Sequence, residues 1–133
     1  MRLVRNFSNE ERKEFLSKAR CLVYTPQNEH FGIVPVEAML AGTPVVAHRS
    51  GGPKESVVDG VCGYLCEATP EDFAEKITKI MMLSREEHKE MCDAAVKNAK
   101  ERFSFEAFSK RLNEIVDEML SKDKKKKSSK KDD

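Results

Sequence analysis

The chain has 133 residues, a length that corresponds to a single domain. Its 24 Lys and Arg residues nearly balance 23 Asp and Glu, giving a net charge of +1, and we expect no nucleic-acid partner. No apolar run approaches the ~18 residues that a bilayer-spanning helix needs, and no signal peptide is recognisable, so we expect this segment to be cytosolic.

The first predicted elements are a helix and a strand. Ser8 and Glu11 have the spacing of a capping box, in which each side chain binds the backbone N–H of the other residue, so a helix should begin there. Residues 1–7 ahead of it can supply one strand. The apolar Cys21–Tyr24 behind it predicts another strand, which the turn-forming sequence Thr-Pro-Gln-Asn ends.

A second helix and strand are predicted after that turn. Pro35 has no N–H to lose in a first helical turn, so the helix should begin near Ile33 or Val34. Gly42–Pro44 stops it before the apolar Val45–Ala47, a second strand. Strand, loop, helix and strand in this order form a parallel βαβ unit. The sequence therefore predicts an α/β fold with a Rossmann-like parallel sheet and flanking helices.

Two carboxylates, Glu29 and Glu37, stand eight positions apart around the start of this helix. A helix start presents unpaired N–H groups and about half a positive charge, which attract phosphate, and Gly32 lets a ligand approach the backbone. Carboxylates on both sides of a diphosphate are suited to binding hydroxyls of a sugar and of a ribose. Glu37 near a helix start would also be favourable without a ligand, by roughly 0.3 to 1 kcal/mol.

The remaining elements continue the α/β pattern. A short strand is expected within Val61–Cys66 and a helix over residues 69–83. A second capping box, Ser84 with Glu87, begins the next helix, and Ser104 opens the last one. The last helix has an apolar stripe, which we expect to face the core. Its members are Phe108, Leu112, Ile115, Val116 and Met119.

Most of the cysteines lie in or beside apolar strands, and none has C-x-x-C spacing. We therefore expect reduced, buried thiols and no metal site. The four residues are Cys21, Cys62, Cys66 and Cys92.

The chain ends in a Lys-rich tail, Lys122–Asp133, with seven Lys and three Asp residues. This composition cannot build a core, so we expect disorder here and a domain over residues 1–121. Besides adding solubility, such a tail can adhere to anionic membrane surfaces at about 1 kcal/mol per Lys. Lys130 and Lys131 also resemble the dilysine signal that returns membrane proteins to the endoplasmic reticulum.

Several of these motifs together resemble the retaining glycosyltransferases of family 4, which have the GT-B fold. They are the two glutamates with seven residues between them, the Phe31–Gly32 pair and the downstream Ser50–Glu55. The resemblance covers residues 7–120. Because His30 and Pro35 are not general family features, it is strongest to the α-1,3/1,6-mannosyltransferases that extend the dolichol-linked oligosaccharide.

This resemblance implies most of the C-terminal, donor-binding domain of a GT-B enzyme. The acceptor-binding N-terminal half would be missing, so we interpret the chain as a fragment, a truncated gene model or half of a split enzyme. The implied reaction transfers mannose from GDP-mannose to a dolichyl-diphosphate-linked oligosaccharide at the cytosolic face of the endoplasmic reticulum. It retains configuration and needs no metal or cofactor. The alternatives are a non-catalytic nucleotide-sugar-binding or assembly subunit, or a family 4 transferase with another donor such as a UDP-sugar.

The resemblance also implies roles for single residues. Glu29, the candidate catalytic residue, would hydrogen-bond the hydroxyls of the donor mannose, and Glu37 would hold the ribose of GDP. Gly51 and Gly52 would form a loop that shapes the sugar pocket, unless they only end a strand. His30 either contacts the sugar or has a local structural role. The donor-binding residues around the diphosphate would be Phe31, Gly32, Ile33 and Val34.

Overall fold

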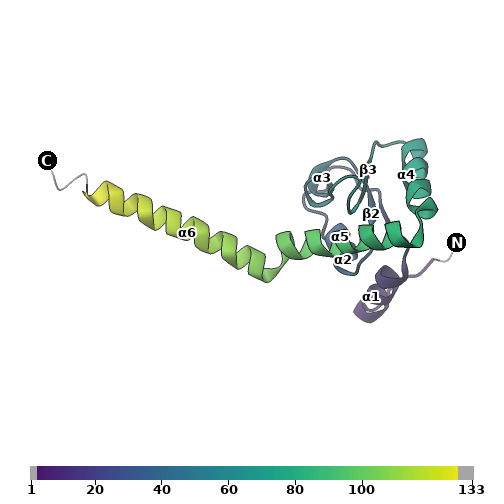
Figure 1. Cartoon of the computed structure of the whole chain (residues 1–133), viewed down its shortest axis with the longest axis horizontal. Coiled ribbons are helices and arrows are strands. Elements are labelled where there is room, and N and C mark those ends of the chain that lie inside the picture. The colour runs from purple at the N-terminus through teal and green to yellow at the C-terminus, as the bar shows by residue number, and fades with distance from the viewer. Residues whose placement is uncertain (1–2, 129–133) are drawn as a thin grey trace. The chain divides into compact units, whose positions relative to one another are not determined.

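The structure is a computed structural model that describes residues 3–128, with side chains described as far as Lys122. It consists of two units, divided between Lys100 and Glu101. The first is an α/β unit and the second is helical (Figure 1). The division comes earlier than the domain end predicted at residue 121.

A parallel three-stranded sheet forms the centre of the first unit. Its strands pair in the order β1-β2-β3 and are β1 (Leu22–Tyr24), β2 (Val45–His48) and β3 (Gly63–Cys66). Helix α2 (Ile33–Leu40) connects β1 to β2, which confirms the predicted βαβ unit. A short helix, α3 (Gly51–Ser56), lies between β2 and β3. Because the strands are parallel, their carboxyl ends meet at one edge, where ligands bind in open α/β sheets.

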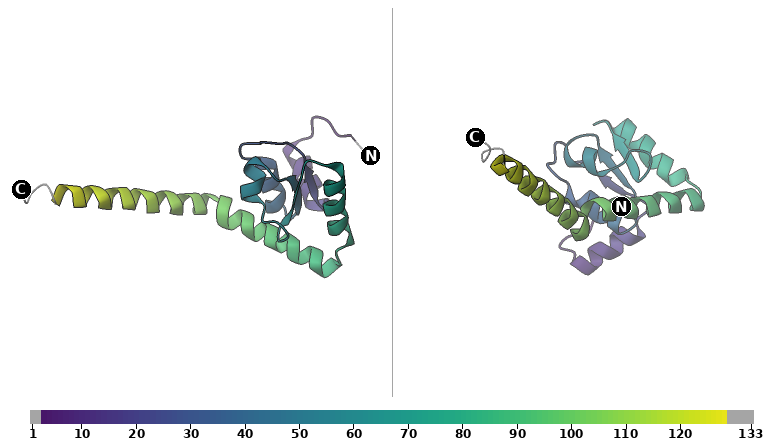
Figure 2. Two further views of the ribbon diagram at one scale, coloured as in Figure 1. Left: turned by 90° about the horizontal axis from the view of Figure 1, so that it is seen from above. Right: turned by 60° about the vertical axis from the view of Figure 1, so that its left-hand side comes forward.

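Helices cover both faces of this sheet. The strands lie between α4 on one side and α2 with α3 on the other (Figures 1 and 2). The other helices are α1 (Asn9–Lys18), α4 (Pro70–Met82), α5 (Arg85–Phe103) and α6 (Phe105–Ser128). Both predicted capping boxes form, with Glu11 N–H donating to Ser8 Oγ at 3.1 Å and Glu87 N–H donating to Ser84 Oγ at 3.2 Å.

The N-terminal strand that residues 1–7 were predicted to supply does not form in the described part, residues 3–7. Asn6 has a φ of 53°, a left-handed backbone conformation that an extended strand does not contain. The segment instead leads as a loop into the capping box of α1.

One hydrophobic cluster of the first unit lies between β2, β3, α4 and Met91 of α5. Val46, Cys66 and Ile80 are buried together, and Phe73 and Ile77 pack against them. Residues 73, 77 and 80 recur on one face of α4, as helical periodicity requires.

None of the four cysteines, all within the described residues, forms a disulfide bond, as predicted. Cys62 and Cys66 are buried, whereas Cys21 and Cys92 are only half-buried. Burial raises the pKa of Cys66 to about 11, so this thiol stays protonated at neutral pH.

The apolar stripe of α6 is exposed, so the prediction that it faces the core is wrong for this structure. The exposed residues include Phe108, Leu112, Ile115, Val116 and Met119. Periodicity shows that a helix has an apolar face, but it does not show what covers that face.

Helix α6 continues through Ser128, and the disorder expected for the Lys-rich tail stays a prediction. Lys is a good helix former, and extending an existing helix is far easier than starting one. Lys130 and Lys131 lie outside the described residues. No helix among the described residues is both long and apolar enough to cross a bilayer.

Candidate donor-binding site

The start of α2 has no side-chain cap. The helix begins at Ile33, as the position of Pro35 predicted. Its N-cap is Gly32, whose φ of +70° is favourable only for glycine, and which supplies no side-chain cap. The N–H groups of the first turn are therefore left for water or an anion. Phe31 and Ile33 on either side are exposed, while Val34 is half-buried.

Glu29 lies in the loop between β1 and α2, ahead of this helix start. Its Oε2 accepts a long hydrogen bond of 3.5 Å from the hydroxyl of Tyr24, the last residue of β1. Desolvation and the negative charge of Glu29 raise the pKa of Tyr24. Tyr24 therefore remains a hydrogen-bond donor to Glu29 at neutral pH. The neighbouring His30 is exposed.

Gly51 and Gly52 bring the start of α3 against the Glu29 loop. A Cβ on Gly51 would lie 2.0 Å from the Glu29 carbonyl oxygen, and one on Gly52 would lie 1.9 Å from the Phe31 carbonyl oxygen. The Gly52 N–H donates to the Glu29 carbonyl at 2.7 Å. The prediction of a loop at these glycines is wrong, because they form the first turn of α3. They are required there because only a residue without Cβ allows this approach.

Glu37 lies one turn inside α2, as predicted, and contacts α1. Arg12 Nη1 donates to Glu37 Oε2 at 3.0 Å. The side chains of Arg12 and Glu37 are 38% and 27% exposed, so solvent weakens the pair without removing it. A cavity of about 650 Å³ lies beside them between α1 and α2, with Leu16 and Leu40 among its lining residues.

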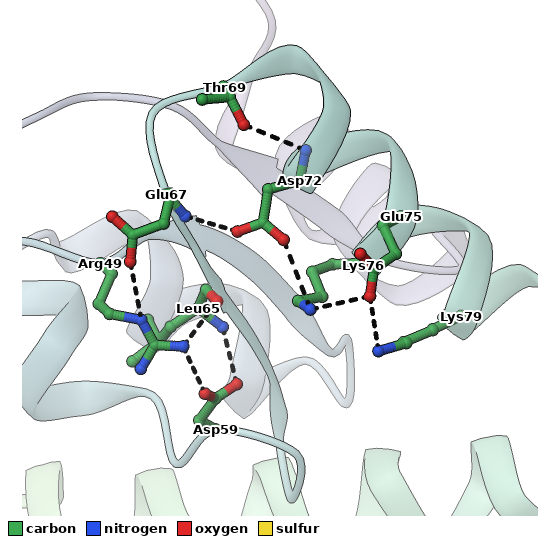
Figure 3. A network of polar contacts seen from close by, with 9 residues as sticks. All are labelled: Arg49, Asp59, Leu65, Glu67, Thr69, Asp72, Glu75, Lys76 and Lys79. Carbon is green, nitrogen blue, oxygen red and sulfur yellow. Dashed lines mark hydrogen bonds and ion pairs between the residues drawn. The ribbon is translucent and has the colours of Figure 1, made fainter.

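A separate polar network fixes the sheet edge beyond β2 and β3 (Figure 3). Arg49 Nη2 donates to Asp59 Oδ2 at 2.7 Å and to the Leu65 carbonyl at 3.0 Å. Arg49 Nε also pairs with Glu67 at 3.5 Å. Partial burial alone would raise the pKa of Asp59, but hydrogen bonds from the Leu65 N–H and from Arg49 lower it. Through these contacts, Arg49 connects the ends of β2 and β3.

No group of three or more His, Cys, Asp or Glu side chains that could hold a metal ion occurs within the described part of the chain.

Residues 2–102 match the family of glycosyl transferases group 1. Since the match covers more than half of the chain, this protein belongs to that family.

Within this family, the chain is similar to curated mannosyltransferases. The chain is 47% identical over 109 residues to the alpha-1,3/1,6-mannosyltransferase ALG2 of Dictyostelium discoideum, which covers 81% of this chain and 26% of that protein. It is 40% identical over 107 residues to the Homo sapiens GDP-Man:Man(3)GlcNAc(2)-PP-Dol alpha-1,2-mannosyltransferase, covering 77% and 21% of the two chains. The chain thus spans only about a quarter of the length of these curated relatives.

Among solved structures, the chain resembles the sucrose-phosphate synthase of Thermosynechococcus elongatus. The TM-score is 0.72 at 24% identity, over 89% of this chain and 30% of that one. At this identity the likeness concerns the fold, and it confirms the predicted α/β architecture with a parallel sheet.

Proposed function

We propose that this chain is the donor-binding part of a retaining mannosyltransferase. It transfers mannose from GDP-mannose to a dolichyl-diphosphate-linked oligosaccharide at the cytosolic face of the endoplasmic reticulum. The observation that carries the proposal is the uncapped start of α2, which has Glu29 in the loop before it and Glu37 one turn inside it. The names of the two mannosyltransferase relatives support the sugar, and the name of the human relative includes GDP-mannose and a dolichol-linked acceptor.

The diphosphate of the donor binds at the start of α2. Its oxygens accept hydrogen bonds from backbone N–H groups around Phe31, Gly32, Ile33 and Val34. The positive end of the helix dipole stabilises the charge that builds up on GDP as the bond to mannose breaks. Gly32 brings the backbone close enough to the phosphates for this contact.

The two carboxylates bind the two ends of the donor. Glu29 binds mannose hydroxyls, with His30 beside it, and Tyr24 holds its carboxylate. Glu37 binds the ribose of GDP next to Arg12. Gly51 and Gly52 limit the sugar pocket by pressing α3 against the Glu29 loop.

The acceptor is bound by a part of the enzyme that this chain does not include. The curated relatives are about three to four times as long, which leaves room for a second domain facing the donor. The Lys-rich tail Lys122–Asp133 attracts the anionic surface of the membrane that holds the lipid-linked acceptor.

Titration calorimetry of the 133-residue chain with GDP-mannose, GDP and UDP-glucose tests this function. We expect GDP-mannose to bind in preference to UDP-glucose. Gly32→Val should abolish binding, because it places a side chain on a left-handed residue at the phosphate contact. Gly60→Val is a matched control, since Gly60 has a similar φ of +76° but lies away from α2.

Two results would refute the proposal. One is a wild-type chain that binds none of the three ligands at millimolar concentration. The other is a Gly32→Val chain that binds GDP-mannose as tightly as Gly60→Val does. A preference for UDP-glucose would assign the chain to another sugar donor within the same family.

A further inference from the structure

The residues after β2 hold the Glu29 loop by a side chain as well as through the backbone. Ser50, the residue before α3, accepts a hydrogen bond at its Oγ from the backbone N–H of Asn28 at 2.9 Å. His48, at the end of β2, has its Nδ1 2.6 Å from the same Ser50 Oγ. A chain of hydrogen bonds therefore runs from β2 to the residue immediately before Glu29.

Asn28 needs such a contact because its backbone is unfavourable. Its φ is 55°, which lies in the left-handed region that residues other than glycine rarely adopt. Asn tolerates this conformation better than most residues, but an exposed loop would leave it readily for an extended one. The Ser50 contact selects the left-handed conformation, because it depends on the direction of the Asn28 N–H.

Two contacts bracket Asn28 and Glu29. Ser50 Oγ accepts a hydrogen bond from the N–H of Asn28, the first backbone group of this pair. The Gly52 N–H donates to the carbonyl of Glu29, the last backbone group of the pair, at 2.7 Å. Both contacts come from residues 50–52. Since the backbone is held on both sides of the Glu29 Cα, the direction of the Glu29 Cα–Cβ bond is fixed, and Tyr24 contacts the carboxylate at its end.

His48 determines how the Ser50 hydroxyl points. A serine hydroxyl has one proton to donate and otherwise rotates freely. With its oxygen accepting the Asn28 N–H, the Ser50 proton can be donated to the unprotonated Nδ1 of a neutral His48 ring. His48 is half-buried at the end of a paired strand, so it offers this acceptor from a fixed place.

We propose that Ser50, oriented by His48, is a positioning residue that aims the carboxylate of Glu29 at the donor sugar. The inference rests on the proposed function for the identity of the ligand. Satisfying the Asn28 N–H does not require Ser50, because Asn28 is exposed and water can accept this hydrogen bond. What Ser50 adds is orientation, which matters for a carboxylate that must meet particular sugar hydroxyls.

The experiment compares Ser50→Ala with Ser50→Thr, which keeps the hydroxyl and suits the extended backbone of residue 50. Hydrogen exchange by NMR reports on the Asn28 amide, and calorimetry gives the affinities for GDP and GDP-mannose. We expect exchange of Asn28 to become about two- to tenfold faster in Ser50→Ala, as loss of one hydrogen bond allows. The affinity for GDP should stay unchanged, while the ratio of GDP-mannose affinity to GDP affinity falls at least about threefold. Ser50→Thr should restore this ratio and the slow exchange of the Asn28 amide.

Two further variants complete the design. His48→Leu removes the acceptor of the hydroxyl and should give part of the Ser50→Ala effect. Ser121→Ala is the control, because the Ser121 hydroxyl donates within α6 to the Asp117 carbonyl at 2.8 Å, and this change should leave both readouts unaffected.

Unchanged Asn28 exchange in Ser50→Ala would overturn the inference. So would equal losses of GDP and GDP-mannose affinity, since these would mean a general effect on the fold. If the wild-type chain binds neither ligand, the proposed function fails. The exchange comparison then decides alone whether Ser50 holds the loop.

Discussion

Gly52→Ala should destabilise the chain, although the same change in most helices stabilises them. The added Cβ would lie 1.9 Å from the Phe31 carbonyl oxygen, and 2.2 Å and 2.5 Å from the C and Cα atoms of Phe31. All three are backbone atoms, so no flexible side chain can move aside. An ordinary contact begins near 3.4 Å, so α3 and the loop must separate by about 3.4 − 1.9 = 1.5 Å.

The magnitude follows from three contributions. Replacing glycine by alanine in a helix without a clash would gain about 0.5 to 1 kcal/mol. Overpacking costs about 1 to 3 kcal/mol, and separating α3 from the loop also breaks the Gly52 to Glu29 hydrogen bond, which contributes about 0.5 to 1.5 kcal/mol. The net loss should be about 0.5 to 4 kcal/mol, centred near about 2 kcal/mol, which is a large part of the stability of a small domain.

Urea denaturation followed by circular dichroism measures this loss. Gly60→Ala is the control, because it strains a left-handed residue with no atom within 4 Å of the new Cβ, and it should cost only about 1 to 2 kcal/mol. A Gly52→Ala chain as stable as the wild type would show that α3 does not press against the Glu29 loop.

Three further predictions concern charge, thiol reactivity and ligand binding. Because hydrogen bonds outweigh burial and lower the pKa of Asp59 in the folded state, its stabilising contribution is present above the unfolded pKa of about 3.9 and is lost as the pH falls through the folded value. Thermal melts at pH 7 and pH 3 should therefore show a smaller acid-induced loss for Asp59→Asn than for the wild type, and equal losses would contradict this. Cys66 has a pKa of about 11 and no exposed surface. It should therefore react with a thiol reagent at pH 7.5 only as fast as the chain unfolds. Rapid labelling of Cys66 in the native chain would contradict its burial. Glu37→Gln should weaken GDP and GDP-mannose alike by roughly 1.5 to 3 kcal/mol, whereas Glu29→Gln should weaken only GDP-mannose; calorimetry in which Glu29→Gln weakens GDP as strongly as Glu37→Gln would reverse our assignment of sugar and ribose.

The sequence predicted the features that depend on a few neighbouring residues. Pro35 indicated the start of α2 correctly, and the Ser8 and Ser84 capping boxes both form. These signals are local, because proline geometry and capping side chains act within one helical turn. The same locality explains the failure at Gly51 and Gly52, which read as a turn but begin α3.

Contacts between distant segments could not be read from the sequence. Arg12 and Glu37 are 25 positions apart, and their pairing depends on how α1 and α2 pack. Ser50 and Asn28 are 22 positions apart, and nothing in a serine before two glycines indicates which amide it will hold. The exposed stripe of α6 shows the same limit in another way. The apolar periodicity in the sequence predicts that this face is buried, but it does not specify which surface would cover it.

The partners of the two carboxylates fit the different roles that we propose for them. Arg12 offsets part of the charge of Glu37, which then sits beside a diphosphate with less repulsion and can still accept hydrogen bonds from neutral ribose hydroxyls. Glu29 is contacted by Tyr24, a neutral donor at long range, so its negative charge is retained. In the reaction that we propose, positive charge develops on the mannose ring as GDP leaves. A retained negative charge interacts more strongly with that ring in the transition state than with the bound donor. On this reasoning the sugar end of the site contributes to rate and the ribose end contributes to binding.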